Sequence, residues 1–261
     1  VIIWLSGLIF LFTDSIGRKY LAVAIVYFTT IAGLLFFNGK GYYSMGLYPT
    51  LFALGGLALE KWTVKNTLRN SMFRVSLPVI MLLLLIPILP ALVPMDTPQN
   101  LEKKYKATGM DKTGILKWEK NDIHAIPQDF ADMLGWKELA VKTARAYNQL
   151  PDDIKKETII FADNYGQAGA LNFYRKELGL PEIFSDNASF LYWLPNSFPY
   201  RHVILIDFEP RDSSDMVFKH FESHSILDSL TQDYAREKGL LIMLYRNGDD
   251  SLQSLAAEAI R

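Results

Sequence analysis

The sequence of 261 residues contains no cysteine. This absence excludes disulfide bonds, thiolate metal ligands and a cysteine nucleophile. An initial methionine is missing as well, because the first residue is Val1 and it falls inside an apolar run. We therefore expect the sequence to be the C-terminal part of a longer polypeptide, from which no signal peptide can be read.

The C-terminal two thirds of the chain lack a net positive charge. Residues 1–95 hold seven basic and two acidic residues, net +5, whereas residues 96–261 hold 20 basic and 26 acidic residues, net −6. Nucleic-acid binding needs clustered lysines and arginines, so the acidic part argues against DNA or RNA as a partner. The asymmetry predicts that the two parts occupy different environments.

Three long stretches near the N-terminus lack any charge. They are residues 20–37, 41–59 and 75–95, and a shorter apolar run at residues 1–13 precedes them. A helix of about 20 apolar residues crosses the hydrocarbon core of a bilayer. The pattern predicts that residues 1–95 form transmembrane helices, the first of them truncated.

The basic residues between these stretches predict an orientation. Arg18 and Lys19 lie in the loop of residues 14–19, and four basic residues lie in the loop of residues 60–74. The positive-inside rule assigns both loops to the cytoplasm. Residues 38–40 and everything after residue 95 then lie outside. The expected location is the inner (cytoplasmic) membrane, crossed several times, with an extracytoplasmic C-terminal domain.

The rest of the chain resembles a soluble α/β domain in its pattern. Residues 96–130 are mostly polar and predict a linker, and residues 131–261 form the domain itself. Apolar runs at residues 158–162, 202–208 and 240–245 predict strands. Amphipathic or capped segments at residues 136–149, 167–178 and 251–261 predict helices. Strands that alternate with helices indicate a small layered domain with a largely parallel sheet.

A motif of glycines and tyrosines stands between the second and third uncharged stretches. It reads GKGYYSMGLYP at residues 39–49 and contains Lys40, Tyr42, Tyr43 and Tyr48. A lysine flanked by glycines can approach a phosphate at the membrane surface as a compact charge. The alternative is an ordinary aromatic belt with a lysine that reaches toward water. On residue types alone the second interpretation is the more common one.

The longer segment GKGYYSMGLYPTLFALGGLALEK, residues 39–61, resembles the late-helix region of lipid-linked sugar transferases of glycosyltransferase family 39. The run DNYGQAGA, residues 163–170, resembles the extracytoplasmic domain of bacterial members. The resemblance implies a GT-C fold, so that residues 1–95 would be the end of a transmembrane helical bundle. It also implies that Lys40, Tyr42 and Tyr43 lie near the phosphate of a polyprenyl carrier, and Tyr48 is added as a further phosphate-positioning candidate.

The resemblance leaves one role unfilled. The family's catalytic aspartate lies in the first outer loop, a region that this sequence does not contain. No residue here is therefore named as the catalytic base. No cofactor and no metal is implied.

Three residues of the α/β part are candidate acceptor-binding residues. Asn164 and Tyr165 follow a predicted strand and precede a predicted helix, where ligands bind in open parallel sheets. The alternative is that Asn164 simply caps the helix. Trp193 belongs to an aromatic group, Phe190, Tyr192, Trp193, Phe198 and Tyr200, that could stack on a sugar, cover the core or rest on a bilayer.

Two further clusters have weaker signals. His220 and His224 have the i, i+4 spacing of a metal site with Glu222 between them, but the order differs from the HExxH pattern and no third ligand is evident. A non-metal role is therefore expected. Asp207, Glu209, Asp212 and Asp215 follow a predicted strand and could line an acceptor site, although a solvated loop is the default.

The sequence thus predicts part of an integral-membrane glycosyltransferase. It would move a sugar from a polyprenyl-phosphate carrier to an extracytoplasmic glycan, lipid or protein acceptor. A different class is the alternative: a membrane-tethered glycan-binding module without catalysis.

Overall fold

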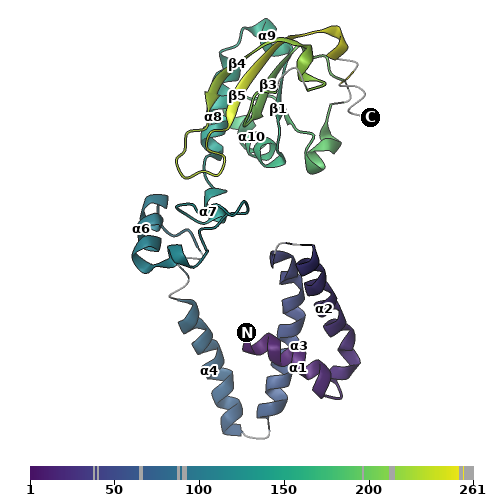
Figure 1. Ribbon diagram of the computed structural model, residues 1–261, viewed down its shortest axis with the longest axis vertical. Coiled ribbons are helices and arrows are strands. Elements are labelled where there is room, and N and C mark those ends of the chain that lie inside the picture. Colours follow the sequence, from purple (N-terminus) through teal and green to yellow (C-terminus); the bar gives the residue numbers. More distant parts are fainter. Residues whose placement is uncertain are drawn as a thin grey trace. The chain divides into compact units, whose positions relative to one another are not determined.

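A computed structural model describes residues 1–37, 39, 41–64, 67–86, 89, 93–195, 197–211, 215–252 and 255. The chain divides into two compact units, Val1–Val93 and Pro94–Arg261, drawn in Figure 1. Each unit has its own core and is described by itself.

The first unit is helical in its described residues. Helix α1 packs along α3, and two glycines make this approach possible. A Cβ atom at Gly7 would collide with the backbone of Leu51, and one at Gly55 would collide with the backbone of Ile3. The elements are α1 (Ile2–Thr13), η1 (Gly17–Tyr20), α2 (Leu21–Phe36), η2 (Gly41–Leu47), α3 (Tyr48–Thr63) and α4 (Thr67–Leu85).

The expected membrane fold class, the end of a GT-C transmembrane bundle, is wrong. Among the described residues, only the helical segment Gly17–Phe36 is long and apolar enough to cross a membrane, with 20 residues. The run at residues 41–59 divides into 3₁₀ turns and the 16-residue helix α3. In α4 the apolar part, Ser71–Leu85, is shorter than a span. A run without charge is therefore not one continuous helix, and the chain is a mixed α/β protein with a five-stranded sheet.

The second unit contains the sheet. Its strands are β1 (Thr158–Ala162), β2 (Ile183–Phe184), β3 (His202–Asp207), β4 (Phe221–Ser229) and β5 (Leu241–Gly248), in the order β2-β1-β3-β5-β4. Strand β1 runs parallel to β2 and β3, whereas β5 is antiparallel to both β3 and β4. The sheet is therefore mixed and not largely parallel.

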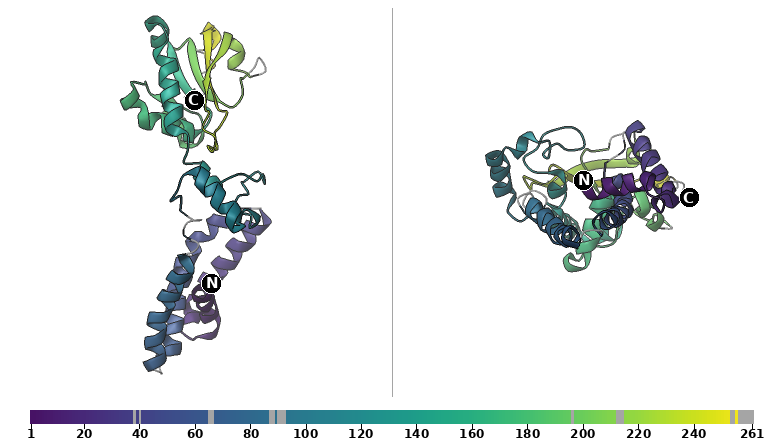
Figure 2. Two further views of the ribbon diagram at one scale, coloured as in Figure 1. Left: turned by 90° about the vertical axis from the view of Figure 1, so that its left-hand side faces the viewer. Right: turned by 90° about the horizontal axis from the view of Figure 1, so that it is seen from below.

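Helices cover one face of this sheet, as Figure 2 shows. On that face Ile160 and Ile204 pack with Leu139 of α8 and Leu171 of α10. The helices of the unit are α6 (Pro98–Thr108), α7 (Gln128–Ala131), α8 (Trp136–Asn148), α9 (Asp152–Lys156) and α10 (Tyr165–Leu178), with 3₁₀ turns η3 (Met110–Lys112), η4 (Ala188–Trp193) and η5 (Phe218–His220).

The other face carries the alternate residues of the same strands, as the two-residue period of a strand requires. Val203, Leu205, Met243 and Tyr245 are buried there against Phe218. Besides residues of the strands themselves, the segments after β2 and β3 supply partly buried side chains that pack on this face, namely Phe198, Tyr200 and Val217. A pocket lies on this face.

The predicted strands at residues 158–162, 202–208 and 240–245 and the helices at 136–149 and 167–178 are confirmed to within a few residues. Helix α6 occupies the start of the stretch interpreted as a linker; Thr97 caps its N-terminus and Gly109 ends it in the left-handed conformation. The predicted closing helix, residues 251–261, lies outside the described residues except for Ser251, Leu252 and Leu255.

Candidate functional site

Strands β1 and β3 are parallel neighbours, and their carboxyl ends lie at the same edge of the sheet. From this edge the chain continues in opposite directions. From β1 it passes through α10 to β2 on one side, whereas β3 lies on the other side of β1 and leads away toward β4. Ligands of open α/β sheets bind at such a switch point. Asp163 follows β1 directly and Asp207 ends β3, so both carboxylates lie at this edge.

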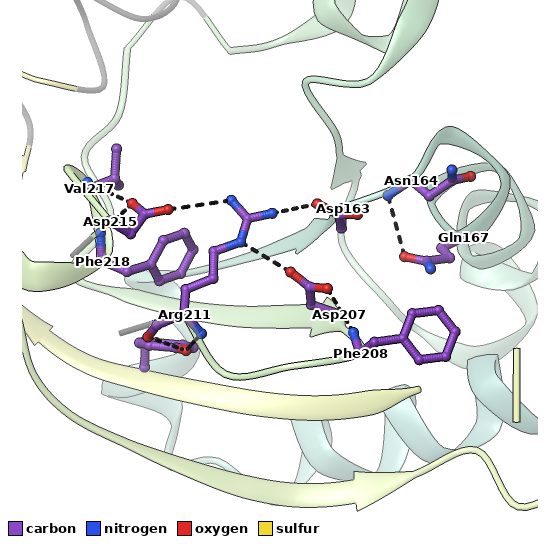
Figure 3. Close-up of polar contacts among 10 residues, drawn as sticks. Asp163, Asn164, Gln167, Asp207, Phe208, Arg211, Asp215, Val217 and Phe218 are labelled. Carbon is purple, nitrogen blue, oxygen red and sulfur yellow. Dashed lines mark hydrogen bonds and ion pairs between the residues drawn. The ribbon is translucent and has the colours of Figure 1, made fainter. Parts of the chain in front are cut away.

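Arg211 joins these carboxylates, as Figure 3 shows. Its Nε donates a hydrogen bond to Asp207 Oδ2 at 3.1 Å, and one Nη donates to the Asp163 carboxylate. The other Nη lies 3.9 Å from Asp215 Oδ2. The guanidinium group is thus close to three carboxylates. Asp207 and Asp215 lie four residues from Arg211 on either side, whereas Asp163 lies 48 positions away.

The backbone of Arg211 is hydrogen-bonded to Tyr245, a buried residue of β5. The hydroxyl of Tyr245 accepts a hydrogen bond from the Arg211 N–H at 2.8 Å and donates one to the Arg211 carbonyl at 3.0 Å. The guanidinium group lies over the ring of Phe218, 5.2 Å from its centroid. Asp215 in turn accepts the backbone N–H groups of Val217 and Phe218. Arg211 is therefore fixed at both its backbone and its side chain.

The edge carries more negative than positive charge. Burial raises the pKa of Asp163, the charges of Asp207 and Asp186 raise it further, and Arg211 offsets this only in part. Burial works to lower the pKa of Arg211, but its hydrogen bond to Asp207 and the surrounding carboxylates outweigh burial, so that pKa is raised. The guanidinium group stays charged, and a surplus of carboxylate oxygens remains to accept hydrogen bonds.

A pocket of about 440 Å³ lies next to Arg211, on the sheet face that the helices leave open. Its aromatic lining residues are Phe161, Phe198, Phe218 and Phe221. Arg211, Asp215 and Asp186 are its charged lining residues. Small-molecule sites commonly combine an apolar wall of this kind with a few convergent polar groups.

Two of the expected acceptor-binding residues stand at this edge. The Asn164 side-chain oxygen accepts the N–H of Gly166 at 2.8 Å, and the Gln167 side chain accepts the N–H of Asn164 at 3.3 Å, so Asn164 caps α10. The side chain of Tyr165 is 55% exposed at the start of the same helix. Whether either residue contacts an acceptor stays a prediction.

Trp193 lies at a different pocket. It belongs to η4, is 61% exposed, and its ring meets that of Phe190 edge-on at 5.1 Å. Both rings line a pocket of about 380 Å³ together with Arg175, Lys176 and Glu182. The structure thus separates Trp193 from the Arg211 pocket.

Lys40, the central residue of the expected phosphate site, lies outside the described residues. Tyr42 and Tyr43 lie on η2, both more than half exposed, with ring centroids 4.6 Å apart. Tyr48 begins α3 and packs edge-on against Trp4, with ring centroids 5.7 Å apart. The three tyrosines thus belong to one connection between α2 and α3.

The two histidines His220 and His224 do not lie on one helical face. His220 ends η5 and bonds Asp249 at 3.0 Å, whereas His224 lies on β4 and stacks on Tyr245. In the part of the chain that the structure describes, no group of three or more His, Asp or Glu side chains is placed to hold a metal ion. Of the acidic loop, Asp207 and Asp215 reach Arg211, and Asp212 lies outside the described residues.

No protein-family model, no curated protein and no solved structure matches the chain. The features that bear on function are therefore the motif at residues 39–61 and the geometry around Arg211.

Proposed function

We propose that this chain is part of a membrane-attached glycosyltransferase whose donor is a sugar linked to polyprenyl phosphate. In this proposal the α/β unit lies on the outer side and binds hydroxyl groups of the acceptor at Asp163, Asp207 and Arg211. The observation that carries the acceptor site is the convergence of these three side chains at the switch point of the sheet, beside an aromatic pocket.

The chemistry of the cluster suits a hydroxyl-rich ligand. Ionised carboxylates accept hydrogen bonds from hydroxyl groups, and a guanidinium group donates them in a fixed planar fork. Here each carboxylate uses only part of its acceptor capacity on Arg211. A sugar ring with neighbouring hydroxyl groups can therefore bridge carboxylate and guanidinium without displacing their mutual contacts.

The donor side rests on the segment that resembles family 39. Lys40 would offset the charge of the departing lipid phosphate, an electrostatic role. Tyr42, Tyr43 and Tyr48 would position that phosphate through their hydroxyl groups. The helical segment Gly17–Phe36 would attach the chain to the membrane. The general base that activates the acceptor hydroxyl would come from outside this sequence.

The second candidate function is glycan binding without catalysis. One observation favours it: all members of the Arg211 cluster belong to the α/β unit and are mutually paired, which suits recognition more than proton transfer. Sugar binding by the α/β unit is common to both candidates. Binding of the lipid phosphate separates them.

The acceptor site is tested by calorimetric titration of the full chain with the methyl glycosides of glucose, mannose and galactose. Arg211→Ala should weaken binding about tenfold, because a hydrogen bond to a charged group contributes roughly 1.5–3 kcal/mol. Arg236→Ala is the matched control, since Arg236 also pairs with two carboxylates, Asp132 and Glu119. Absence of binding to all three sugars, or equal loss in both variants, contradicts the proposed acceptor site.

The donor side is tested with a fluorescent polyprenyl phosphate added to the full chain. Lys40→Ala should weaken its binding about tenfold, whereas Lys19→Ala, which removes a lysine from η1, should not. Sugar binding without any phosphate binding would favour the glycan-binding module. Phosphate binding that both variants retain contradicts the role of Lys40.

A further inference from the structure

The pocket beside Arg211 is lined by two chemically different groups of residues. Its charged lining residues are Asp186, Arg211 and Asp215, and Asp215 pairs with Arg211. The other lining residues that the structure describes are all apolar. Charged groups that include the Arg211–Asp215 pair thus share the pocket with a lining that is otherwise aromatic and aliphatic.

A saccharide alone does not match this lining, because most of the lining residues are apolar. Hydroxyl groups placed against Phe161, Phe198 and Phe221 would lose their hydrogen bonds to water without gaining others, which costs free energy. An apolar group in the same place gains from leaving water in proportion to the area it buries. The volume of about 440 Å³ lies in the range of small-molecule sites.

We propose that the α/β unit takes an amphipathic ligand: a saccharide whose attached apolar group, an aromatic ring or a short hydrocarbon chain, occupies this pocket. The sugar hydroxyl groups meet Arg211 and its carboxylates beside this pocket. This inference rests on the proposed sugar site and adds the chemical class of the group attached to the sugar.

Leu191 offers a way to block the apolar part without disturbing the core. It lines the pocket and is 46% exposed, so a larger side chain has room to turn over the opening. Leu227 on β4 is its matched control, since it is 38% exposed and lines a different pocket. Leu194→Trp, at another lining residue, serves as a second blocking variant.

The test compares the methyl, phenyl and 2-naphthyl glycosides of glucose, mannose and galactose by calorimetric titration of the full chain. For the sugar that binds, the 2-naphthyl glycoside should bind about tenfold more tightly than the methyl glycoside, with the phenyl glycoside between them. Leu191→Trp and Leu194→Trp should remove this advantage and leave methyl glycoside binding unchanged. Leu227→Trp should leave both unchanged.

The outcomes separate this inference from the proposed function. Equal affinities of the three glycosides, or an aryl advantage that both blocking variants keep, overturn the inference while the sugar site stands. If Arg211→Ala binds the aryl glycosides with undiminished affinity, the pocket binds the aryl group without recognising the sugar. This outcome also overturns the inference. Absence of binding by all methyl and aryl glycosides overturns the sugar site and the inference together.

Discussion

Tyr245 connects the core of the sheet to Arg211 through a single hydroxyl group. That group is buried, and it bonds both the N–H and the carbonyl of the arginine. Two backbone polar groups of a surface segment are satisfied in this way. The position of the guanidinium group at the edge therefore depends on a residue that does not itself line the pocket.

Tyr245→Phe should lower the free energy of unfolding by about 1–3 kcal/mol, because it leaves two backbone groups without their partner. It should also weaken sugar binding, since Arg211 is no longer held. Urea unfolding and calorimetric titration measure the two effects. Tyr105→Phe is the control, because the buried Tyr105 hydroxyl bonds none of the described residues. An effect no larger than that of the control contradicts the role of Tyr245.

We expect the free energy of unfolding to depend on pH because of His202. Burial lowers its pKa below the usual 6.5, and Arg246 and Arg201 lower it further against the opposing charge of Glu157. Its Nδ1 accepts the N–H of Asn247 at 3.2 Å, which requires the neutral ring. Between the lowered pKa and 6.5 the unfolded chain binds more protons than the folded one, so stability falls as the pH drops through this window.

The measurement is urea unfolding at pH 7.5 and at pH values below 6.5. His202→Gln should remove part of the loss of stability on acidification, whereas His224→Gln, a substitution of an exposed histidine on β4, should not. The same loss in wild type and His202→Gln would exclude this histidine as its source.

At the scale of elements, the start of α10 depends on Asn164. Its side chain accepts the N–H of Gly166, and Gln167 completes the reciprocal capping box. Asn164→Ala should lower the free energy of unfolding by about 1 kcal/mol. Asn187→Ala is the control, because Asn187 precedes η4 without a side-chain capping bond. Equal effects in urea unfolding contradict the capping role; the sugar affinity of Asn164→Ala shows whether its amide also contacts the acceptor.

Strongly patterned elements were predictable and weakly patterned ones were not. Residues 158–162 and 202–208 form short apolar runs rich in β-branched residues, which favour a buried strand, and the predicted helix at 136–149 has one apolar face. β4 was missed because it is an outer strand of the sheet, and its first residues, FESHS, are mostly exposed and have no apolar alternation. β2 has two residues, too few for any pattern.

The helices of the first unit show why uncharged stretches alone do not predict transmembrane helices. Residues 41–59 contain no charge, but glycine, serine and tyrosines at their start form 3₁₀ turns, and α3 begins only at Tyr48 with Pro49 in its first turn. A hydropathy pattern measures the composition of a segment, not the continuity of its helix. The expected bundle was wrong for this reason.

At the scale of the whole molecule, the candidate site combines segments that the sequence keeps apart. Asp163 was predictable as the end of a strand beside Asn164, and Asp207 as the start of an acidic loop. Arg211 was not, because a loop arginine has no periodicity and its pairing with Asp163 joins residues 48 positions apart. Only the parallel pairing of β1 and β3 brings them together.

The most direct test of the account follows the side-chain Nε–Hε signals of the arginines by nuclear magnetic resonance during titration with the 2-naphthyl glycoside. The account predicts a saturable shift of the Arg211 signal, whose Nε donates to Asp207, and no shift of the Arg236 signal. Binding that leaves the Arg211 signal in place, or that shifts Arg236 instead, would contradict a sugar site at the edge of β1 and β3.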